Sequence, residues 1–298
     1  MRNVINERLE ALREEMDREH LWACIIPTAD RHSLKRSEFV CVADHWRGCE
    51  WISGYNGADG TAVVTMESEA LWTTDGFNQS DWELLHSTNS RGSTEVAIDG
   101  TCCSVSRVRQ LTDELRHEGG LTLRTNLDVL SRVWKDRPPL PSEPVEIEEG
   151  ESVSSKLQRI RKALRDRHAD GMLVADLEDI AWTLNLRGRD SEGKPAFAGY
   201  LLISTQNVTL YINKEQGAGL KDYLQTEGIA VDDYANVEKG LKDYFEYNIL
   251  MDPDEVNYSL FTSIGDKAYK SGREMACRSA VQVVEAPSPV PALRNPNY

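Results

Sequence analysis

The sequence predicts an α/β protein built from two similar domains, and three observations lead to this prediction. Apolar stripes with helical spacing alternate along the chain with short apolar strands, an order typical of α/β layers. The stretch "KDRPPLPSEPVEIEEGES" interrupts this alternation, because its four prolines neither continue a helix nor donate to a sheet ladder. We expect it to be an extended, semi-stiff connector. Beyond it the order of elements repeats, at an offset of roughly 140 residues that fits a duplicated domain.

The elements of the first half follow from periodicity and from helix and strand ends. Ile5, Leu9, Leu12 and Met16 recur on one face of an amphipathic helix. "LWACIIP" is a short buried strand that proline ends, and "GTAVVTM" with "ALWTTDG" predicts a hairpin. A second helical stripe carries Val108, Leu111 and Leu115 and stops at Gly119-Gly120. "LTLRT" then predicts a strand, and "NLDVLSRVW" a short helix capped by Asn126.

The second half repeats this order. Its first helix carries Val153, Leu157, Ile160 and Leu164 on one face, and "GMLVA" follows as a buried strand. "LEDIAWTLNLRG" places a tryptophan before a glycine turn, as the first half does, and "GYLLISTQNVTLYIN" predicts strand, polar turn and strand. "GLKDYLQTEG", "IAVDDY", "NVEKGLKDYFEY" and "ILMD" then alternate helix and strand.

The glycines of "WISGYNGADGTAVVT" raise the question of a phosphate-binding loop. Such a loop needs its glycines between a strand and a helix, so that free N–H groups and the helix dipole face the phosphate. Here Gly54, Gly57 and Gly60 lead into a strand, and no GK[ST] follows. We therefore expect them to shape a tight turn into the hairpin, with backbone angles that other residues avoid.

Composition and charge restrict the class of protein. A formal net charge of −15 disfavours nucleic acid or an anionic membrane as the main partner. No apolar run is long enough for a membrane span, and the N-terminus lacks a signal-peptide core. The six cysteines form no CxxC pair and no zinc-finger spacing, so we expect free thiols and a cytoplasmic protein, with disulfides or a metal site as the alternative.

The motifs and their order resemble the Xaa-Pro aminopeptidase family over nearly the whole chain. "SEFVCVADHWRGCEWISGYNGADGTAVVT" and "ALWTTDG" are similar to the family's first domain. "DRPPLPSEPV", "KLQRIRKAL", "LEDIAWTLNLRGRD", "YLLIS", "LYIN" and "VVEAPSPV" are similar to its second domain. The resemblance implies two creatinase/prolidase N-terminal-type domains, residues 1–141 and 142–298, each a mixed β-sheet flanked by helices.

The same resemblance implies that catalysis belongs to a third domain. In the family a C-terminal "pita-bread" domain holds two metal ions, generally manganese, through two Asp, one His and two Glu, and the metals activate a water that attacks the X–Pro bond. This sequence ends in "VVEAPSPVPALRNPNY", where such a domain would begin. We therefore expect no catalytic residue, metal ligand or cofactor within residues 1–298, and hydrolysis of peptides only through a catalytic domain.

Two groups of residues are candidates for contact with a peptide or a second subunit. Arg187 and Asp190 of "LNLRGRD" match a family loop, while Arg189 stands where Ser is common. The alternative is an Arg–Asp pair that only ties the loop down. Trp46 and Arg47 form the second group, in which we expect Trp46 to face a partner, while Trp51 packs in the core.

Several motifs depart from the family pattern, mostly in the first domain. Cys49 replaces a basic residue, "GADGT" carries Ala58 and Asp59, and residues 75–78 lack an Arg-Tyr pair. "KPAF" (194–197) replaces N-P-V-F in the second domain. These departures fit a chain that no longer performs peptidase work.

The sequence therefore predicts a non-catalytic, two-domain portion or truncated relative of an Xaa-Pro aminopeptidase. Its expected roles are subunit assembly and substrate gating, with a second copy or a full-length homologue as partner. Other interpretations stay open: an autonomous enzyme with an unrecognised site, or a small-molecule-binding module. His32 and His45, each near an aspartate, are a weak metal or acid–base candidate against a solvated loop.

Overall fold

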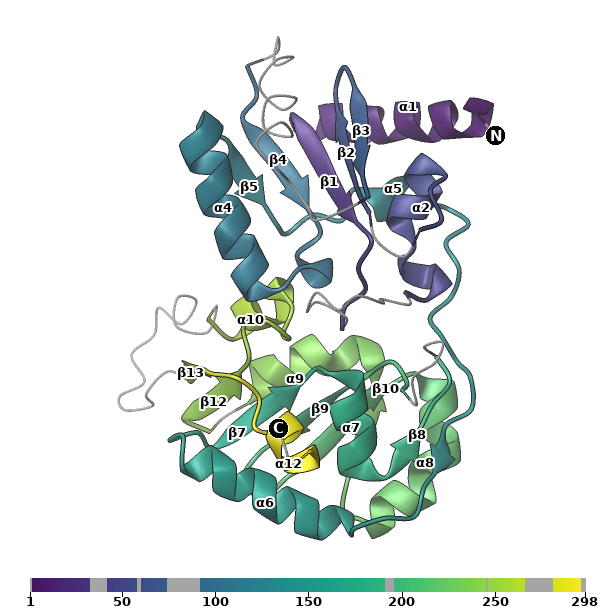
Figure 1. The fold of residues 1–298 in the computed structure, drawn as a ribbon. Coiled ribbons are helices and arrows are strands. Elements are labelled where there is room, and N and C mark those ends of the chain that lie inside the picture. The colour runs from purple at the N-terminus through teal and green to yellow at the C-terminus, as the bar shows by residue number, and fades with distance from the viewer. Residues whose placement is uncertain are drawn as a thin grey trace. The chain divides into compact units, whose positions relative to one another are not determined.

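A computed structural model describes residues 2–32, 42–57, 60–73, 92–190, 196–244, 246–265 and 281–295. The chain divides into two compact units: unit 1 is Met1–Pro139 with Asn257–Ser259, and unit 2 is Leu140–Val256 with Leu260–Tyr298. Each unit contains a mixed β-sheet with helices packed on it, so the predicted fold class is confirmed (Figure 1). Some positions singled out in the sequence lie outside the described residues, namely Cys41, Ala58, Asp59, 75–78, 194–195 and Cys277.

The described part of unit 1 contains a five-stranded sheet in the order β3–β2–β1–β4–β5. Its central strand β1 (Ala23–Pro27) runs antiparallel to β2 (Thr61–Thr65) and parallel to β4 (Glu95–Ile98). β3 (Glu69–Trp72) completes the predicted hairpin with β2, and β5 (Thr122–Arg124) extends the parallel side. The helices are α1 (Arg2–Arg18), α2 (Gly48–Ser53), α4 (Val105–Gly119) and α5 (Leu130–Val133).

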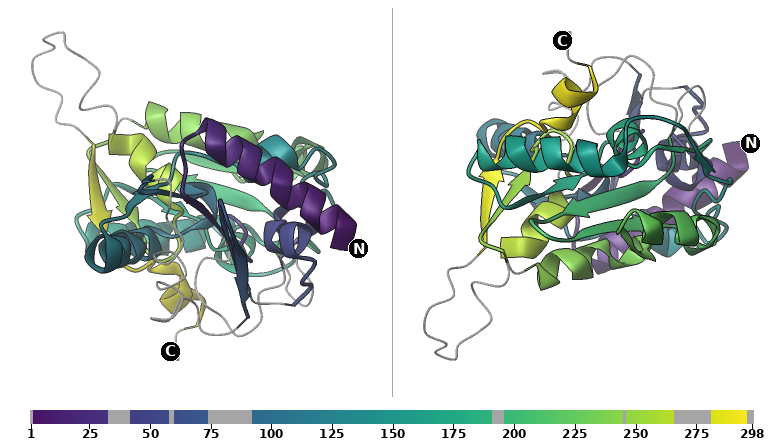
Figure 2. Two further views of the ribbon diagram at one scale, coloured as in Figure 1. Left: turned by 90° about the horizontal axis from the view of Figure 1, so that it is seen from above. Right: turned by 90° about the horizontal axis from the view of Figure 1, so that it is seen from below.

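Both faces of the unit 1 sheet are buried. Alternate residues of β1 belong to different apolar clusters, because successive side chains of a strand point to opposite faces. Cys24 and Ile26 lie in the cluster that contains the apolar stripe of α1, whereas Ala23 and Ile25 lie in the cluster that contains the stripe of α4. Figure 2 shows α1, in purple, along its whole length on the outside of this unit.

The described part of unit 2 contains a six-stranded sheet in the order β11–β10–β9–β7–β12–β13. These strands are β7 (Gly171–Val174), β9 (Gly199–Ile203), β10 (Val208–Ile212), β11 (Ala230–Asp233), β12 (Asn248–Met251) and β13 (Gln282–Glu285). β9 and β10 form the predicted antiparallel pair, while β7, β12 and β13 run parallel. A separate two-stranded sheet joins β6 (Glu146–Ile147) to β8 (Leu186–Arg187).

The main apolar cluster of unit 2 lies on one face of its sheet. It unites buried residues of α6 (Val153–Arg165), α7 (Leu177–Leu184), α8 (Lys214–Thr226) and α12 (Val290–Arg294) with inward side chains of β7, β9, β10 and β12. α9 (Val237–Asp243) lies against the other face, where a Cβ on Gly240 would come within 1.8 Å of the Tyr211 hydroxyl oxygen. α10 (Tyr258–Gly265) follows β12 in the chain.

Four helices begin at a Ser, Asp or Asn whose side chain caps the first turn, and one predicted cap is not found. Ser104, Ser152, Asp176 and Asn213 each accept a backbone N–H at the start of a helix. The predicted cap Asn126 is wrong, because α5 begins at Leu130, three residues later than a helix capped by Asn126 would begin. The N-cap position is Val129, and the Asp128 carboxylate just before it accepts the Ser131 amide at 3.0 Å, while Asn126 forms an isolated bridge with Asp99.

Burial governs the chemistry of the described cysteines. Cys24, Cys49, Cys102 and Cys103 are free thiols, as expected. Desolvation raises the pKa of Cys24 and of Cys103 to about 12, so both remain protonated at neutral pH.

No helix within the described ranges has the length and apolar character that crossing a membrane requires.

Candidate functional site

The Arg187–Asp190 segment follows α7 and begins with the short strand β8. Asn185, in the left-handed conformation, ends α7 and turns the chain into β8. Nη1 of Arg187 lies 2.9 Å from Oε1 of Glu148, and Nη2 of Arg189 lies 2.9 Å from Oε1 of Glu146. Both arginine side chains are exposed, at 53% and 69%. Each guanidinium is therefore paired, yet still accessible to solvent.

Asp190 has different partners from the arginines beside it. Its carboxylate accepts the Ala198 amide at 2.9 Å and both oxygens lie within 3.1 Å of Nε2 of Gln216. Burial raises its pKa, and these hydrogen bonds oppose the shift. The Arg–Asp pair considered from the sequence is therefore wrong: each arginine pairs with a glutamate, and Asp190 holds backbone and amide donors.

Trp46 and Arg47 lie in unit 1, where a 3-10 turn (Asp44–Trp46) leads into α2. Trp46 is only 4% exposed, and its ring makes an edge contact with His45 at a centroid distance of 5.1 Å. The expectation that Trp46 faces a partner is therefore not met in this structure. Arg47 is partly exposed and contacts the Val42 carbonyl oxygen and the carboxylates of Asp44 and Glu50.

The two histidines near aspartates do not form a joint site. The His32 amide donates to the Asp30 carboxylate at 2.7 Å, and both residues are buried. Nδ1 of His45 lies 2.6 Å from the Pro138 carbonyl oxygen, and burial lowers the pKa of its ring. Within the described ranges, no three His, Cys, Asp or Glu side chains come together as metal ligands.

The turn glycines have two different structural reasons. Gly54 follows α2 with a φ of 75°, in the left-handed region that favours glycine. Gly57 and Gly60 lie outside that region, so the predicted unusual angles are not found there. They are restricted by the Tyr55 side chain instead, because a Cβ at Gly57 would lie 1.9 Å from its hydroxyl oxygen and one at Gly60 would lie 3.2 Å from its ring carbons.

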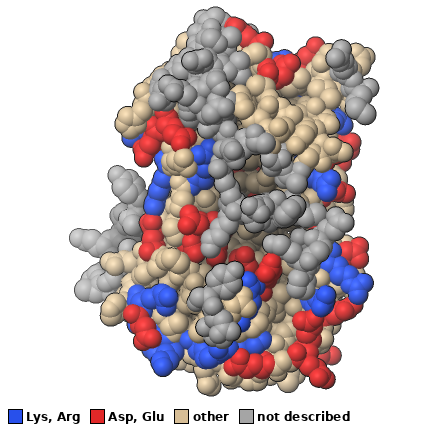
Figure 3. All heavy atoms as spheres, in the orientation of Figure 1, with Lys and Arg blue, Asp and Glu red and all other residues tan. Residues whose placement is uncertain are grey.

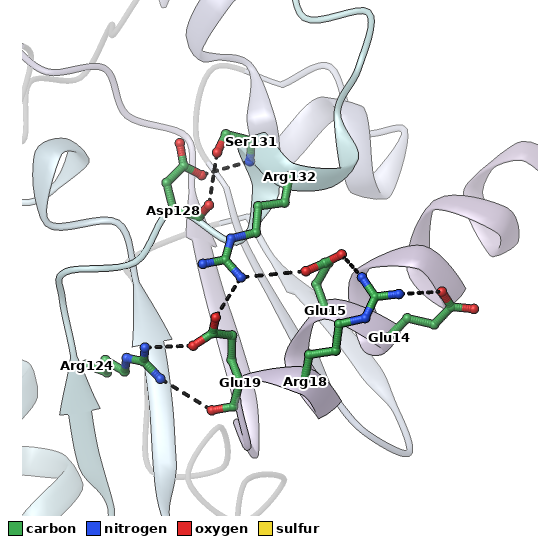
Figure 4. A network of polar contacts seen from close by, with 8 residues as sticks. All are labelled: Glu14, Glu15, Arg18, Glu19, Arg124, Asp128, Ser131 and Arg132. Atoms are coloured by element: carbon green, nitrogen blue, oxygen red, sulfur yellow. Dashed lines mark hydrogen bonds and ion pairs between the residues drawn. The ribbon is translucent and has the colours of Figure 1, made fainter.

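A second polar network lies in unit 1, at the end of α1 (Figure 4). Glu19 accepts hydrogen bonds from Arg132 at 2.6 Å and from Arg124 at 2.7 Å, and these two arginines lower its pKa. Arg18 pairs with Glu14 and Glu15 on the same helix. The network joins α1 to β5 and α5, and its charges are paired with one another. We assign it to the stability of unit 1.

Sequence reasoning missed the partners of the Arg187–Asp190 segment, namely Glu146, Glu148 and Gln216. A signal for two of them was present. Glu146 and Glu148 are two residues apart, as are Arg187 and Arg189, so in extended chain each pair lies on one face. Gln216 carried no signal, because it reaches Asp190 only after α8 has packed on the sheet.

Comparisons with known proteins agree with this fold. The pattern of the family described as "Creatinase/Prolidase N-terminal domain" matches residues 136–294. Proteins named "Probable Xaa-Pro aminopeptidase P" are similar in sequence: that of Botryotinia fuckeliana is 34% identical over 78% of this chain and 39% of its own length. That of Fusarium vanettenii is 36% identical over 69% of this chain and 37% of its own length. The chain thus spans about two fifths of the length of these relatives.

A solved structure with a similar fold is the X-prolyl aminopeptidase of Caenorhabditis elegans, described as a cytosolic enzyme with a di-nuclear active site. The TM-score is 0.74 at 22% identity, and the match covers 88% of this chain and 49% of that chain. At 22% identity, this similarity supports a shared fold and nothing further.

Proposed function

Because this chain belongs to the creatinase/prolidase N-terminal domain family, we propose that it serves assembly and substrate access in an Xaa-Pro aminopeptidase-type protein. The observation that carries the proposal is the similarity to proteins named Xaa-Pro aminopeptidase P, which extends over both units of this chain but over two fifths of their length. We propose that hydrolysis depends on a catalytic domain that residues 1–298 do not supply.

We infer a scaffolding role for the described residues. Manganese chemistry of the kind expected from the family needs a cage of carboxylates and a histidine. Within the described ranges, no three His, Cys, Asp or Glu side chains lie together as such a cage would require. Their polar groups hold segments together, as Asp190 and Gln216 do in unit 2.

Two exposed cations are the proposed contacts to a peptide or a second subunit. Arg187 and Arg47 keep part of their guanidinium groups accessible while carboxylates fix their positions. Asp190 and Trp46 are proposed to act indirectly, by holding the segments that carry these arginines. The free thiols and the cytosolic description of the Caenorhabditis elegans enzyme support a cytoplasmic location for this chain.

The test compares the chain alone with the chain in the presence of a full-length homologue. The purified chain is incubated with Mn²⁺ and an Ala-Pro-containing peptide, with and without chelator. We expect no release of the N-terminal residue by the chain alone, and a change in the homologue's KM for peptide when the chain is added. Chelator-sensitive release by the chain alone would overturn the proposal.

Sedimentation supplies the second measurement, because assembly is part of the proposed role. We expect the chain to associate with itself or to co-sediment with the homologue. A clean monomer at high concentration, together with no effect on the homologue, contradicts the role in assembly.

A further inference from the structure

The connector enters unit 2 as a segment that is bound along its length. We call residues 141–151 the strap. Side-chain amides hold its backbone at three points: Asn213 donates to the Pro141 oxygen at 3.0 Å, Gln216 to the Glu143 oxygen at 2.7 Å, and Asn185 to the Glu151 oxygen at 2.9 Å. The strap is thus fixed on unit 2 rather than free, and its residues Glu146–Ile147 form the strand β6.

The middle of the strap is paired with the Arg187–Asp190 segment. β6 and β8 are antiparallel, with Glu146 opposite Arg187 and Ile147 opposite Leu186. The ion pairs run diagonally to this register, from Glu146 to Arg189 and from Glu148 to Arg187. The Glu148 amide also donates to the Asn185 oxygen at 2.8 Å. Two glutamates of the strap therefore face two arginines across the two-stranded β6–β8 pair, which we call the ladder.

The arginine side of this ladder is itself rigid. Asp190 receives hydrogen bonds from Ala198 and Gln216, and its own amide donates to the Ala196 oxygen. A Cβ on Gly188 would come within 2.5 Å of that same oxygen, so the backbone passes too close for any other residue. Gln216 contacts both Asp190 and the strap, which couples the two segments.

Little apolar burial holds the strap. Val145 is partly buried against the main cluster of unit 2, but Ile147 is 53% exposed. Polar contacts must therefore supply much of the attachment. Exposed ion pairs are individually weak and screened by salt, so we expect their share of the attachment to decrease as ionic strength rises.

We infer that the Arg187–Asp190 segment is a clasp that fastens the strap to unit 2, so that Arg187 and Arg189 are positioning residues for the connector. The inference stands on contacts within unit 2 and does not depend on the proposed function. It assigns a structural role to Arg189, which stands where Ser is common in the family: its guanidinium holds Glu146 of the strap. It also makes the fastening of the strap sensitive to ionic strength.

Hydrogen exchange of the full chain tests the clasp. The variant Arg187→Glu/Arg189→Glu replaces both attractions by repulsions. We expect the amides of residues 146–148 to exchange about 3- to 30-fold faster, the range that two exposed ion pairs imply. The fourfold variant that adds Glu146→Arg/Glu148→Arg restores opposite charges across the ladder and is expected to return exchange to within about twofold of wild type.

A matched control changes the same number of charges elsewhere in unit 2. Lys162 and Arg165 are exposed on α6, where Figure 3 shows basic side chains gathered, and within the described ranges neither makes an ion pair. Lys162→Glu/Arg165→Glu is expected to leave exchange in the strap unchanged. Equal acceleration in this control would show a general effect of charge and would overturn the clasp.

Salt provides a measurement on the wild-type chain, in case the variants fold poorly. Raising ionic strength from about 0.01 M to about 1 M shortens the screening length from about 30 Å to about 3 Å. We expect faster exchange in residues 146–148 with little change in α6. Unchanged exchange in the strap, or a uniform change over all of unit 2, contradicts the inference.

Discussion

His45 is a residue whose protonation is governed by the fold. Its ring lies against Trp46, and its Nδ1 donates to the Pro138 oxygen while the Arg137 side chain donates to the His45 carbonyl oxygen. Burial lowers the pKa of the ring, and the positive charges of Arg137 and Arg31 lower it further. The hydrogen bond to the Pro138 oxygen raises the pKa of the ring and is the main influence against this shift, and the negative charge of Asp128 adds a smaller one. The folded state therefore favours the neutral imidazole.

This environment predicts a loss of stability in mild acid. The unfolded chain binds a proton near pH 6.5 and the folded chain at lower pH, so the contribution of His45 is present above 6.5 and is lost as pH falls through the folded pKa. The free energy of unfolding of wild type and of His45→Asn is compared at about pH 7.5 and about pH 5.5, bracketing the ordinary histidine pKa. Asn can still donate to Pro138 but does not titrate.

We expect wild type to lose more stability than His45→Asn over this interval. Identical losses in the two proteins contradict a depressed pKa at His45.

The sequence predicted which apolar residues are buried better than it predicted which polar residues pair in the candidate site. The apolar stripe of α6, from Val153 to Leu164, is buried as its spacing predicts. The partners of Arg187, Arg189 and Asp190 were not predicted as pairs, because they lie 26 to 43 positions away in the sequence. A charge has several acceptable partners, and the fold selects among them.

At the scale of elements, most helices and strands agree with local patterns. The hairpin β2–β3, the pair β9–β10 and the first helix of each unit follow from periodicity and turn chemistry. β6 and β8 were not predicted, because two-residue strands have no period. Their pairing depends on a contact between the strap and the end of α7.

Two glycines, one at the end of α2 and one inside α8, are expected to respond in opposite ways to substitution by alanine. Gly54 has a φ of 75°, and a Cβ there would lie 2.8 Å from Cδ1 of Ile5, so Gly54→Ala is expected to cost about 1–2 kcal/mol. Gly219 lies within α8, and its Cβ position is open, so Gly219→Ala is expected to stabilise by about 0.5–1 kcal/mol. Urea denaturation measures both. A destabilising Gly219→Ala, or a neutral Gly54→Ala, would contradict these geometries.

At the scale of the whole molecule, each unit has its own apolar core. Residues 282–294, near the end of the described chain, pack into unit 2. β13 pairs with β12 at the edge of the sheet, and Val290 of α12 is fully buried. Nη1 of Arg294 lies 3.3 Å from the carboxylate of Asp179, which is buried in α7. Residues 282–294 are therefore part of the folded unit. The family pattern covers unit 2, and the assignment of unit 1 to the same kind of domain stays a prediction.

Separate cores predict separate responses to destabilisation. Arg294→Met removes the guanidinium beside a buried carboxylate and is expected to cost about 3 kcal/mol. Leu12→Ala leaves a cavity in the core of unit 1 and is expected to cost a similar amount, about 2–5 kcal/mol. In calorimetry we expect the two variants to lower different transitions.

The exposed substitution Arg165→Met serves as control for the first variant and is expected to have little effect. The double variant Asp179→Asn/Arg294→Met is expected to recover part of the loss, because the buried charge is gone. A single transition that both core variants lower alike would contradict two independent units.

The order of strands in unit 1 has a consequence for biosynthesis. β1 leaves the ribosome early, yet its parallel neighbour β4 is translated roughly 70 residues later, a wait of about 4–14 s at ordinary elongation rates. During that interval β2 can pair with one edge of β1, while the backbone groups of the other edge stay available to chaperones and to nascent neighbours. Slowing translation between the codons for Thr65 and Glu95 should therefore lower the soluble yield more than slowing it after Arg124.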